Sequence, residues 1–413
     1  MTPTHSFSPV STRRRSVALT AVLLAVVTLC GVPAQAHTRT TKATTKAHTK
    51  TTKKPPRLHG DPARAVLAYE AMQKHYYVHG SGLYLGEPFS YLWPFSQALA
   101  ATVSLDSIPG MKASYSHEVH VRLIGLHSYQ DFSNAEEPLG AFTSTLPAFD
   151  SEVAPPAGPG GIKYYDDNEW VGIELARVYQ LSHNASALKN AEEIMAFVMA
   201  GWQTVGPEGE PLVCPGGVPF SNSVENTQRN TVTDAPAAEL AIQLFKITHH
   251  VQYLQFAEMA YEWVRQCLLS SSGLYADHIS PRGVINQALW SYNQGTMIGA
   301  GVLLYQVTRN SGYLSQARQT AQVALPYYTP ERLRSEVPFF PLVYFRNLLY
   351  LDSVTHEPPG PSIAQAYVNH AWQDLRFSDD LFVSRPSTSP ELLTQAAIVQ
   401  IYALLSEPAS SYF

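Results

Sequence analysis

Apolar residues recur every three or four positions from about residue 61 to the end of the chain, which is the spacing of amphipathic helices. Alternating apolar and polar positions, the pattern of strands, are few. Helical patterns begin near Arg64, Phe95, Glu118 and Leu392, among others. We therefore expect an all-α fold in a single large domain over 61–413.

Three helical segments share a layout that repeats along the chain. In each, an aromatic residue near the end of one helix is followed by Leu nine positions later and by Ala twelve positions later, with Ser or Thr at offset three. The aromatic residues are Tyr179, Phe245 and Tyr305. A helix–turn–helix unit of this size cannot bury its apolar face alone, so neighbouring copies should stack and share a core. About six such pairs would use the roughly 350 residues available.

The first 36 residues have the pattern of an export signal. Arg13–Arg15 supplies positive charge, 17–29 is an apolar run of signal-peptide length, and Ala34–Ala36 is a small-x-small cleavage site. The apolar run is short for a membrane span. Cys30 offers lipoprotein attachment as an alternative, but the residue before it is a leucine where such sites need a small residue. We expect a secreted, extracellular protein with a signal peptide over 1–36.

Residues 37–60 form a basic linker rich in Thr and Lys. They lack the apolar residues that would offset chain entropy, so a disordered tether is expected. One interpretation is a simple spacer. The other is that its basic residues associate with an anionic cell wall.

Charge is distributed unevenly along the chain. The first 60 residues carry ten Lys or Arg and no Asp or Glu, leaving 18 basic and 33 acidic residues in 61–413. A domain with a net charge of −15 lacks the basic surface that nucleic-acid binding needs. Nucleic acid and polyanionic substrates are therefore excluded, and a neutral substrate is favoured.

The sequence offers no pattern for a metal or other cofactor. Cys214 and Cys267 remain after signal cleavage, and they allow either a disulfide or buried thiols. His117 and His120 are three positions apart and lack the spacing of a His-Glu-x-x-His zinc motif. His249–His250 falls in a turn of the repeat, where solvent contact explains it. We expect no cofactor.

Asp166–Asp167 is the most informative dipeptide of the chain. Asp166 with Glu169 three residues later would make a capping-box-like start for the following helix. Two adjacent carboxylates at a helix entrance can also lie about 5 Å apart, the separation that a retaining glycosidase uses for its nucleophile and its acid/base. At that distance, ionisation of one group raises the pKa of the other. Both interpretations are open from the residues alone.

Three segments together resemble glycoside hydrolase family 76, the bacterial and fungal α-1,6-mannanases. They are Tyr165–Trp170 with its paired aspartates, Arg229–Pro236 with an Asn at a helix entrance, and Ser291–Ala300 with a Tyr-Asn-Gln-Gly helix start. The resemblance covers most of 61–413. It implies an (α/α)6 toroid of helical hairpins with the paired aspartates in a central cleft.

The resemblance also implies roles for individual residues. Asp166 would be the nucleophile and Asp167 the acid/base. The residues expected to contact substrate are Tyr165, Trp170, Asn230, Asp277, Tyr292, Asn293 and Gln294.

The resulting hypothesis is a secreted, monomeric, retaining endo-glycosidase that hydrolyses α-1,6-linked mannan. Aromatic residues beside Asn, Gln and carboxylates suit the faces and hydroxyl groups of a neutral sugar. Two alternatives remain. One is a mannan-directed transglycosylase of the same fold, and the other is a non-catalytic carbohydrate-binding protein on that scaffold.

Overall fold

A computed structural model describes residues 58–130, 146–206, 209–223, 226–357 and 359–413. The compact unit spans Arg57–Phe413. The expected signal peptide and nearly all of the expected linker lie outside the described residues.

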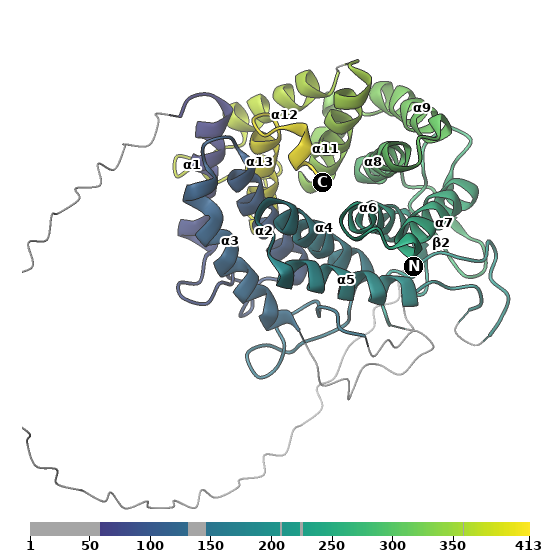
Figure 1. Cartoon of the computed structure of the whole chain (residues 1–413). Helices are drawn as coiled ribbons and strands as arrows, with labels where there is room; N and C mark the ends of the chain where they lie inside the picture. Colours follow the sequence, from purple (N-terminus) through teal and green to yellow (C-terminus); the bar gives the residue numbers. More distant parts are fainter. Residues whose placement is uncertain (1–57, 131–145, 207–208, 224–225, 358) are drawn as a thin grey trace, which may run out of the picture. The chain divides into compact units, whose positions relative to one another are not determined.

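Six helices form a closed inner ring, in which each helix packs against the next and the last packs against the first (Figure 1). In ring order they are α2 (Leu92–Ser107), α4 (Tyr165–Ser182), α6 (Thr231–Thr248), α8 (Ser291–Thr308), α11 (Phe339–Thr355) and α13 (Leu392–Leu404). The outer helices are α1 (Asp61–Tyr76), α3 (Lys112–Leu126), α5 (Ala185–Ala200), α7 (Val251–Leu268), α9 (Ser311–Tyr327) and α12 (Gly360–Asp374). This is an (α/α)6 toroid, and the fold expected from the sequence is confirmed.

Each inner helix is covered by one outer helix. Five of these pairs are consecutive hairpins, whereas α1 packs against α13 and so joins the two ends of the domain. The inner helices are buried on nearly all faces and the outer helices on one face. Glycine lets α8 and α11 approach closely, because a Cβ on Gly295 would lie 2.7 Å from the Cα of Tyr344.

The three predicted repeats are helical hairpins, and a fourth hairpin, α11–α12, has the same turn. The first helix of each hairpin ends at a Ser or Thr, followed by one residue in the left-handed conformation. The backbone N–H of that residue bonds to the carbonyl four positions earlier, at 2.8–2.9 Å. The left-handed residues are His183, His249, Arg309 and His356. The fourth copy escaped the sequence pattern because Asp352 stands where the others have an aromatic residue and Pro361 where they have Leu.

Short elements complete the domain. They are α10 (Pro330–Ser335), the 3₁₀ turns η1 (His127–Tyr129) and η2 (Ala409–Ser411), and a small antiparallel sheet of β1 (Arg229–Asn230), β2 (His278–Ile279) and β3 (Ile285–Asn286). Among the described helices, none is long and apolar enough to span a lipid bilayer.

Cys214 and Cys267 form a disulfide, which settles the choice that the sequence left open. The bond ties the loop before α6 to the outer helix α7. The guanidinium of Arg229 holds the same loop by donating to the carbonyls of Val213, Cys214 and Gly216 at 2.6–2.8 Å. The loop that leads to Phe220 is therefore fixed at two points.

Candidate active site

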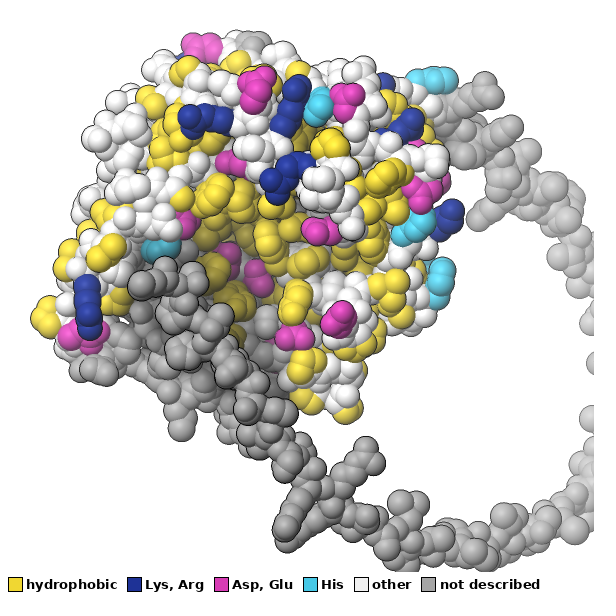
Figure 2. Space-filling model, turned by 180° about the vertical axis from the view of Figure 1, so that it is seen from behind, with side chains coloured by type: hydrophobic (Ala, Val, Ile, Leu, Met, Phe, Trp, Pro, Cys, Tyr) yellow, Lys and Arg dark blue, Asp and Glu magenta, His cyan; other side chains and the backbone are white. Residues whose placement is uncertain are grey.

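A cavity of about 1090 Å³ opens at the N-terminal ends of the inner helices. The second residue of every inner helix lines it. These residues are Trp93, Asp166, Val232, Tyr292, Phe340 and Leu393. Figure 2 shows a hollow in which hydrophobic side chains predominate and acidic side chains lie among them. The expectation that the helix starts bearing Asp166 and Tyr292 face one central cleft is confirmed.

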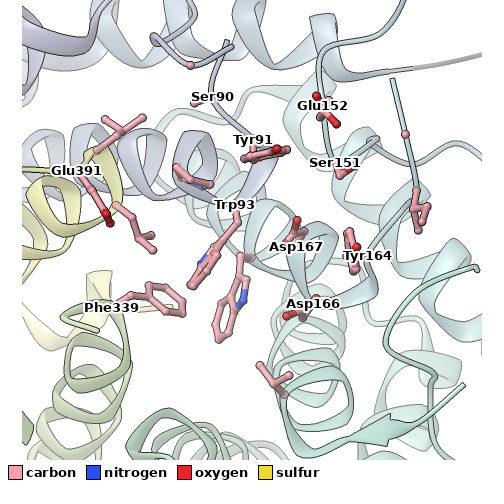
Figure 3. A pocket seen from close by; sticks show the side chains of 18 of the residues that line it. Ser90, Tyr91, Trp93, Ser151, Glu152, Tyr164, Asp166, Asp167, Phe339 and Glu391 are labelled. Atoms are coloured by element: carbon pink, nitrogen blue, oxygen red, sulfur yellow. The ribbon is translucent and has the colours of Figure 1, made fainter. Parts of the chain in front are cut away.

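Asp166 and Asp167 are the second and third residues of α4, and both line the cavity (Figure 3). The N-cap of this helix is Tyr164, which makes no side-chain capping hydrogen bond. The capping-box interpretation of Asp166 is wrong, because Asp166 already lies inside the first turn. Carboxylates at this position still gain from the positive end of the helix dipole.

The two carboxyl groups differ in acidity. Burial raises the pKa of Asp166 to about 7, with a smaller contribution from the negative charge of Asp277. Burial and the charge of Asp166 together raise the pKa of Asp167 well above its usual range. Asp166 therefore ionises first, and its charge keeps Asp167 protonated. The pair can supply one anion and one acid at the same time.

Glu169 lies one turn below Asp166 on α4 and is fully buried. Burial raises the pKa of Glu169 well above its usual range, and the charges of Asp166, Asp234 and Glu239 add to the effect. Burial raises the pKa of Asp234 and of Glu239 well above their usual ranges too, and the nearby Arg229 and Arg346, respectively, oppose that shift. Among the causes that act on Glu169 from the described part of the chain, none is a cation, so its protonated, neutral form is favoured.

Tyr164, rather than Tyr165, lines the cavity. The ring of Tyr165 stacks on Phe197 of α5, with centroids 4.4 Å apart and planes inclined by 10°. Tyr165 is the first residue of α4, and its direction on the helix turns it outward toward the covering helix. Trp170, by contrast, lines the cavity as expected and is 4% exposed.

Gln294 holds a loop in place and does not line the cavity. Its side-chain oxygen accepts from the backbone N–H of Tyr275 at 2.8 Å, and its nitrogen donates to the carbonyl of Tyr275 at 2.9 Å. The fourth residue of four inner helices makes the same kind of clamp, accepting from a backbone N–H in the loop that precedes its own helix. These residues are Asn168, Asp234, Gln294 and Gln395.

The remaining expected contacts also lie outside the cavity wall. Asn230 is the N-cap residue of α6, and its N–H donates to Thr233 Oγ1 at 3.3 Å. Asn293 is fully buried inside α8. Asp277 Oδ2 accepts a hydrogen bond from His278 Nδ1 at 2.9 Å, and its negative charge acts to raise the pKa of Asp166.

Much of the cavity wall was not predicted. Trp93 of α2 meets the ring of Phe339 of α11 edge-on, with centroids 5.3 Å apart, and Phe339 meets the predicted Trp170 of α4 at the same distance. Tyr91 and Phe220 add aromatic faces from loops. Only the identity of these residues signalled a role, because nothing in their spacing shows that α2, α4 and α11 meet.

Within the described ranges, no three His, Cys, Asp or Glu residues lie together in a way that could hold a metal ion. His117 and His120 are exposed on α3, and His249 and His250 are exposed in their turn. The histidines that the sequence analysis weighed thus lie away from the cavity wall.

A toroid of six helix pairs with a carboxyl pair at its mouth is an architecture suited to hydrolysis of glycosidic bonds. The sequence model of glycosyl hydrolase family 76 matches residues 63–343. The chain belongs to this family.

Solved structures agree on the fold. An α-mannanase of this family from Bacteroides thetaiotaomicron has a TM-score of 0.73 and 20% identity, covering 84% of this chain and 96% of that one. An inactive variant of an α-1,6-mannanase from a Salegentibacter species, in complex with α-1,6-mannotriose, has a TM-score of 0.67 and 19% identity, covering 84% and 99%.

Curated relatives match over a shorter stretch. A mannan endo-1,6-alpha-mannosidase of Candida glabrata is 26% identical over 121 residues, which is 27% of this chain and 27% of that protein. Its counterpart from Saccharomyces cerevisiae is 26% identical over 129 residues, 29% of each chain. The match thus spans less than a third of the length of these relatives.

Proposed function

We propose that this protein is a retaining endo-hydrolase of α-1,6-linked mannan. The observation that carries the proposal is the pair Asp166–Asp167, two adjacent carboxyl groups of unequal acidity on the wall of an aromatic-lined cavity. Adjacent carboxyls suit a double displacement, because an inverting enzyme needs more room between them for a water molecule.

In this mechanism ionised Asp166 attacks the anomeric carbon, and protonated Asp167 donates its proton to the departing glycosidic oxygen. Asp167 then takes a proton from water, which attacks the glycosyl-enzyme and releases Asp166. The order of acidity fits these roles, since the group with the lower pKa is the nucleophile. Trp170 and Tyr292, which line the cavity beside the pair, would contact the sugar faces.

The comparisons support the substrate class. The Salegentibacter protein that carries α-1,6-mannotriose is an inactive variant in which two consecutive aspartates are replaced by asparagine. The Candida relative is named for endo-hydrolysis of 1,6-linked mannan. We extend both the linkage and the dependence on paired aspartates to this chain.

The first test is substitution of the proposed nucleophile. Asp166→Asn should lower kcat on α-1,6-mannan by about 10³-fold or more, because no covalent intermediate can form. Calorimetry should still detect mannooligosaccharide binding to the variant. Asp374→Asn is the matched control, because Asp374 is exposed on α12 and lies away from the cavity. Near wild-type turnover by Asp166→Asn would refute the assignment.

We also propose that the protein is secreted and associates with an anionic cell wall. The export-signal pattern of 1–36 supports secretion, and the basic linker of 37–60 supports association with an anionic cell wall. Detection of the mature chain in culture medium, and its release from walls by salt, would test these two statements.

A further inference from the structure

The start of α8 places one aromatic side chain in the cavity and another on the surface outside it. Tyr292, the second residue of the helix, lines the cavity and is 8% exposed. Trp290, the N-cap residue, does not line the cavity and is 37% exposed. The proposed mechanism makes no use of Trp290, although its ring offers a large apolar face to solvent.

Phe340 of α11 connects these two side chains. Its ring centroid lies 4.1 Å from that of Tyr292 and 5.6 Å from that of Trp290. Phe340 itself lines the cavity. The three rings therefore form a row that begins inside the cavity and ends on the exposed surface. We call this set, Tyr292, Phe340 and Trp290, the aromatic row.

The inner end of the aromatic row lies close to the catalytic pair. Burial raises the pKa of Tyr292 well above its usual range, and the negative charges of Asp277 and Asp166 add to the effect. Because such effects weaken with distance, Tyr292 and the proposed nucleophile are near neighbours in the cavity wall. A mannan chain held at Asp166 can therefore continue onto the row.

The outer end of the row stands on a fixed backbone. The carbonyl of Trp290 accepts from Gln294 Nε2 at 3.2 Å. The N–H of the next residue, Ser291, donates to Glu336 Oε1 at 3.0 Å. A ring held on a rigid helix start loses little conformational freedom when a ligand binds to it.

We propose that Trp290 forms a distal subsite for a mannose unit of the substrate chain outside the cavity, which rests on the proposed hydrolysis of α-1,6-mannan. The C–H face of a sugar ring packs well on an indole ring. Asn286 and Gln287, exposed in the segment that precedes Trp290, present amides to the hydroxyl groups of such a unit. A polymer cut internally must extend beyond the cavity, and the aromatic row gives it a path.

The test is the dependence of activity on chain length. It compares kcat/KM on α-1,6-mannohexaose with kcat/KM on α-1,6-mannotriose, a ratio that does not depend on the amount of folded enzyme. Trp290→Leu should lower this ratio about tenfold, because leucine keeps an apolar contact with Phe340 but has no flat face for a sugar. Trp290→Tyr, which keeps a ring, should retain most of the ratio. Phe377→Leu is the matched control, since Phe377 is 47% exposed and does not line the cavity, and it should leave the ratio unchanged.

An unchanged ratio in Trp290→Leu, or an equal loss on both substrates, would overturn the subsite, because a purely structural role affects short and long chains alike. Calorimetry in the Asp166→Asn background separates this inference from the proposed function. There, mannohexaose should bind more tightly than mannotriose, and adding Trp290→Leu should reduce the preference about tenfold. That result without hydrolysis by the wild-type enzyme would overturn only the proposed hydrolysis. A preference that Trp290→Leu leaves unaltered would overturn only the subsite.

Discussion

The carboxyl group of Glu169 shares its helix face with Asp166 and has two further carboxyl groups, those of Asp234 and Glu239, near it on α6. A buried acid in such surroundings keeps its proton, and folding must hold that proton at neutral pH. Glu169 therefore links the chemistry of the site to the stability of the fold.

The neutral state of Glu169 gives a pH-dependent prediction. In the wild type, the raised pKa of Glu169 lowers stability as pH rises above its ordinary value of 4.5, because the unfolded chain can release the proton and the folded chain cannot. Glu169→Gln has no ionisable proton at this position, so it lacks this pH-dependent loss of stability. The free energy of unfolding of Glu169→Gln minus that of the wild type should therefore increase, in favour of the variant, by up to about 1.4 kcal/mol per pH unit above that value.

Denaturant unfolding at pH 5 and pH 8 measures this difference. Glu357→Gln, at an exposed position, should show no such trend. A Glu169→Gln difference that is constant with pH, or that shrinks as pH rises, would mean that Glu169 is ionised in the folded protein.

The catalytic pair predicts the pH profile of activity. Because ionised Asp166 is the proposed nucleophile, kcat/KM should rise as pH increases through about 7, the pKa of Asp166. It should fall again at higher pH, as Asp167 loses its proton. Asp277→Asn removes a negative charge that raises the pKa of Asp166, so the acid limb should move to lower pH. An acid limb near pH 4 in the wild type would contradict these assignments.

At the scale of the helices, the side chains that bind the preceding loop, such as Gln294, explain both what the sequence predicted and what it missed. The Tyr-Asn-Gln-Gly start of α8 was correctly placed at the cavity, but its Gln294 binds the loop at Tyr275. The second position is the one helix position that lines the cavity in all six inner helices; other positions do so in some helices and not in others. A shift of one residue turns a side chain by about 100° around a helix. For this reason Tyr164 lines the cavity, and the expected Tyr165 points toward the covering helix.

The clamps make a prediction for stability. Gln294→Leu would leave the N–H and carbonyl of Tyr275 without their partner inside the protein, at a cost of about 1–3 kcal/mol in the free energy of unfolding. Urea denaturation measures this cost. Gln319→Leu, on the exposed face of α9, should change stability by less than about 0.5 kcal/mol. Equal effects of the two substitutions would show that the clamp contributes nothing.

At the scale of the whole domain, local pattern predicted helices and their repetition, because both depend on the periodic burial of apolar positions. Closure of the ring depends on α13 packing against α2, and the outer helix that covers α13 is α1, more than 300 positions earlier in the chain. No local pattern contains that contact, and the expectation of closure came from the family resemblance. For the same reason Trp93, Phe339 and Leu393 could not be grouped into one cavity from sequence.

The ring also explains why a catalytic site forms at this end of the domain. Closure brings six helix N-termini to one mouth, where their second residues share a cavity. The positive ends of the helix dipoles offset part of the cost of an ionised Asp166 in this setting. The acidic domain surface suits the neutral polymer that we propose as substrate.

Digestion of linear α-1,6-mannan, with product sizing and determination of the anomer formed first, tests the central claim most directly. We predict that internal cleavage releases mannooligosaccharides of several lengths and that the new reducing ends form first in the α configuration. Release of β-configured products, or of no products from a folded enzyme, would contradict the paired-aspartate retaining mechanism.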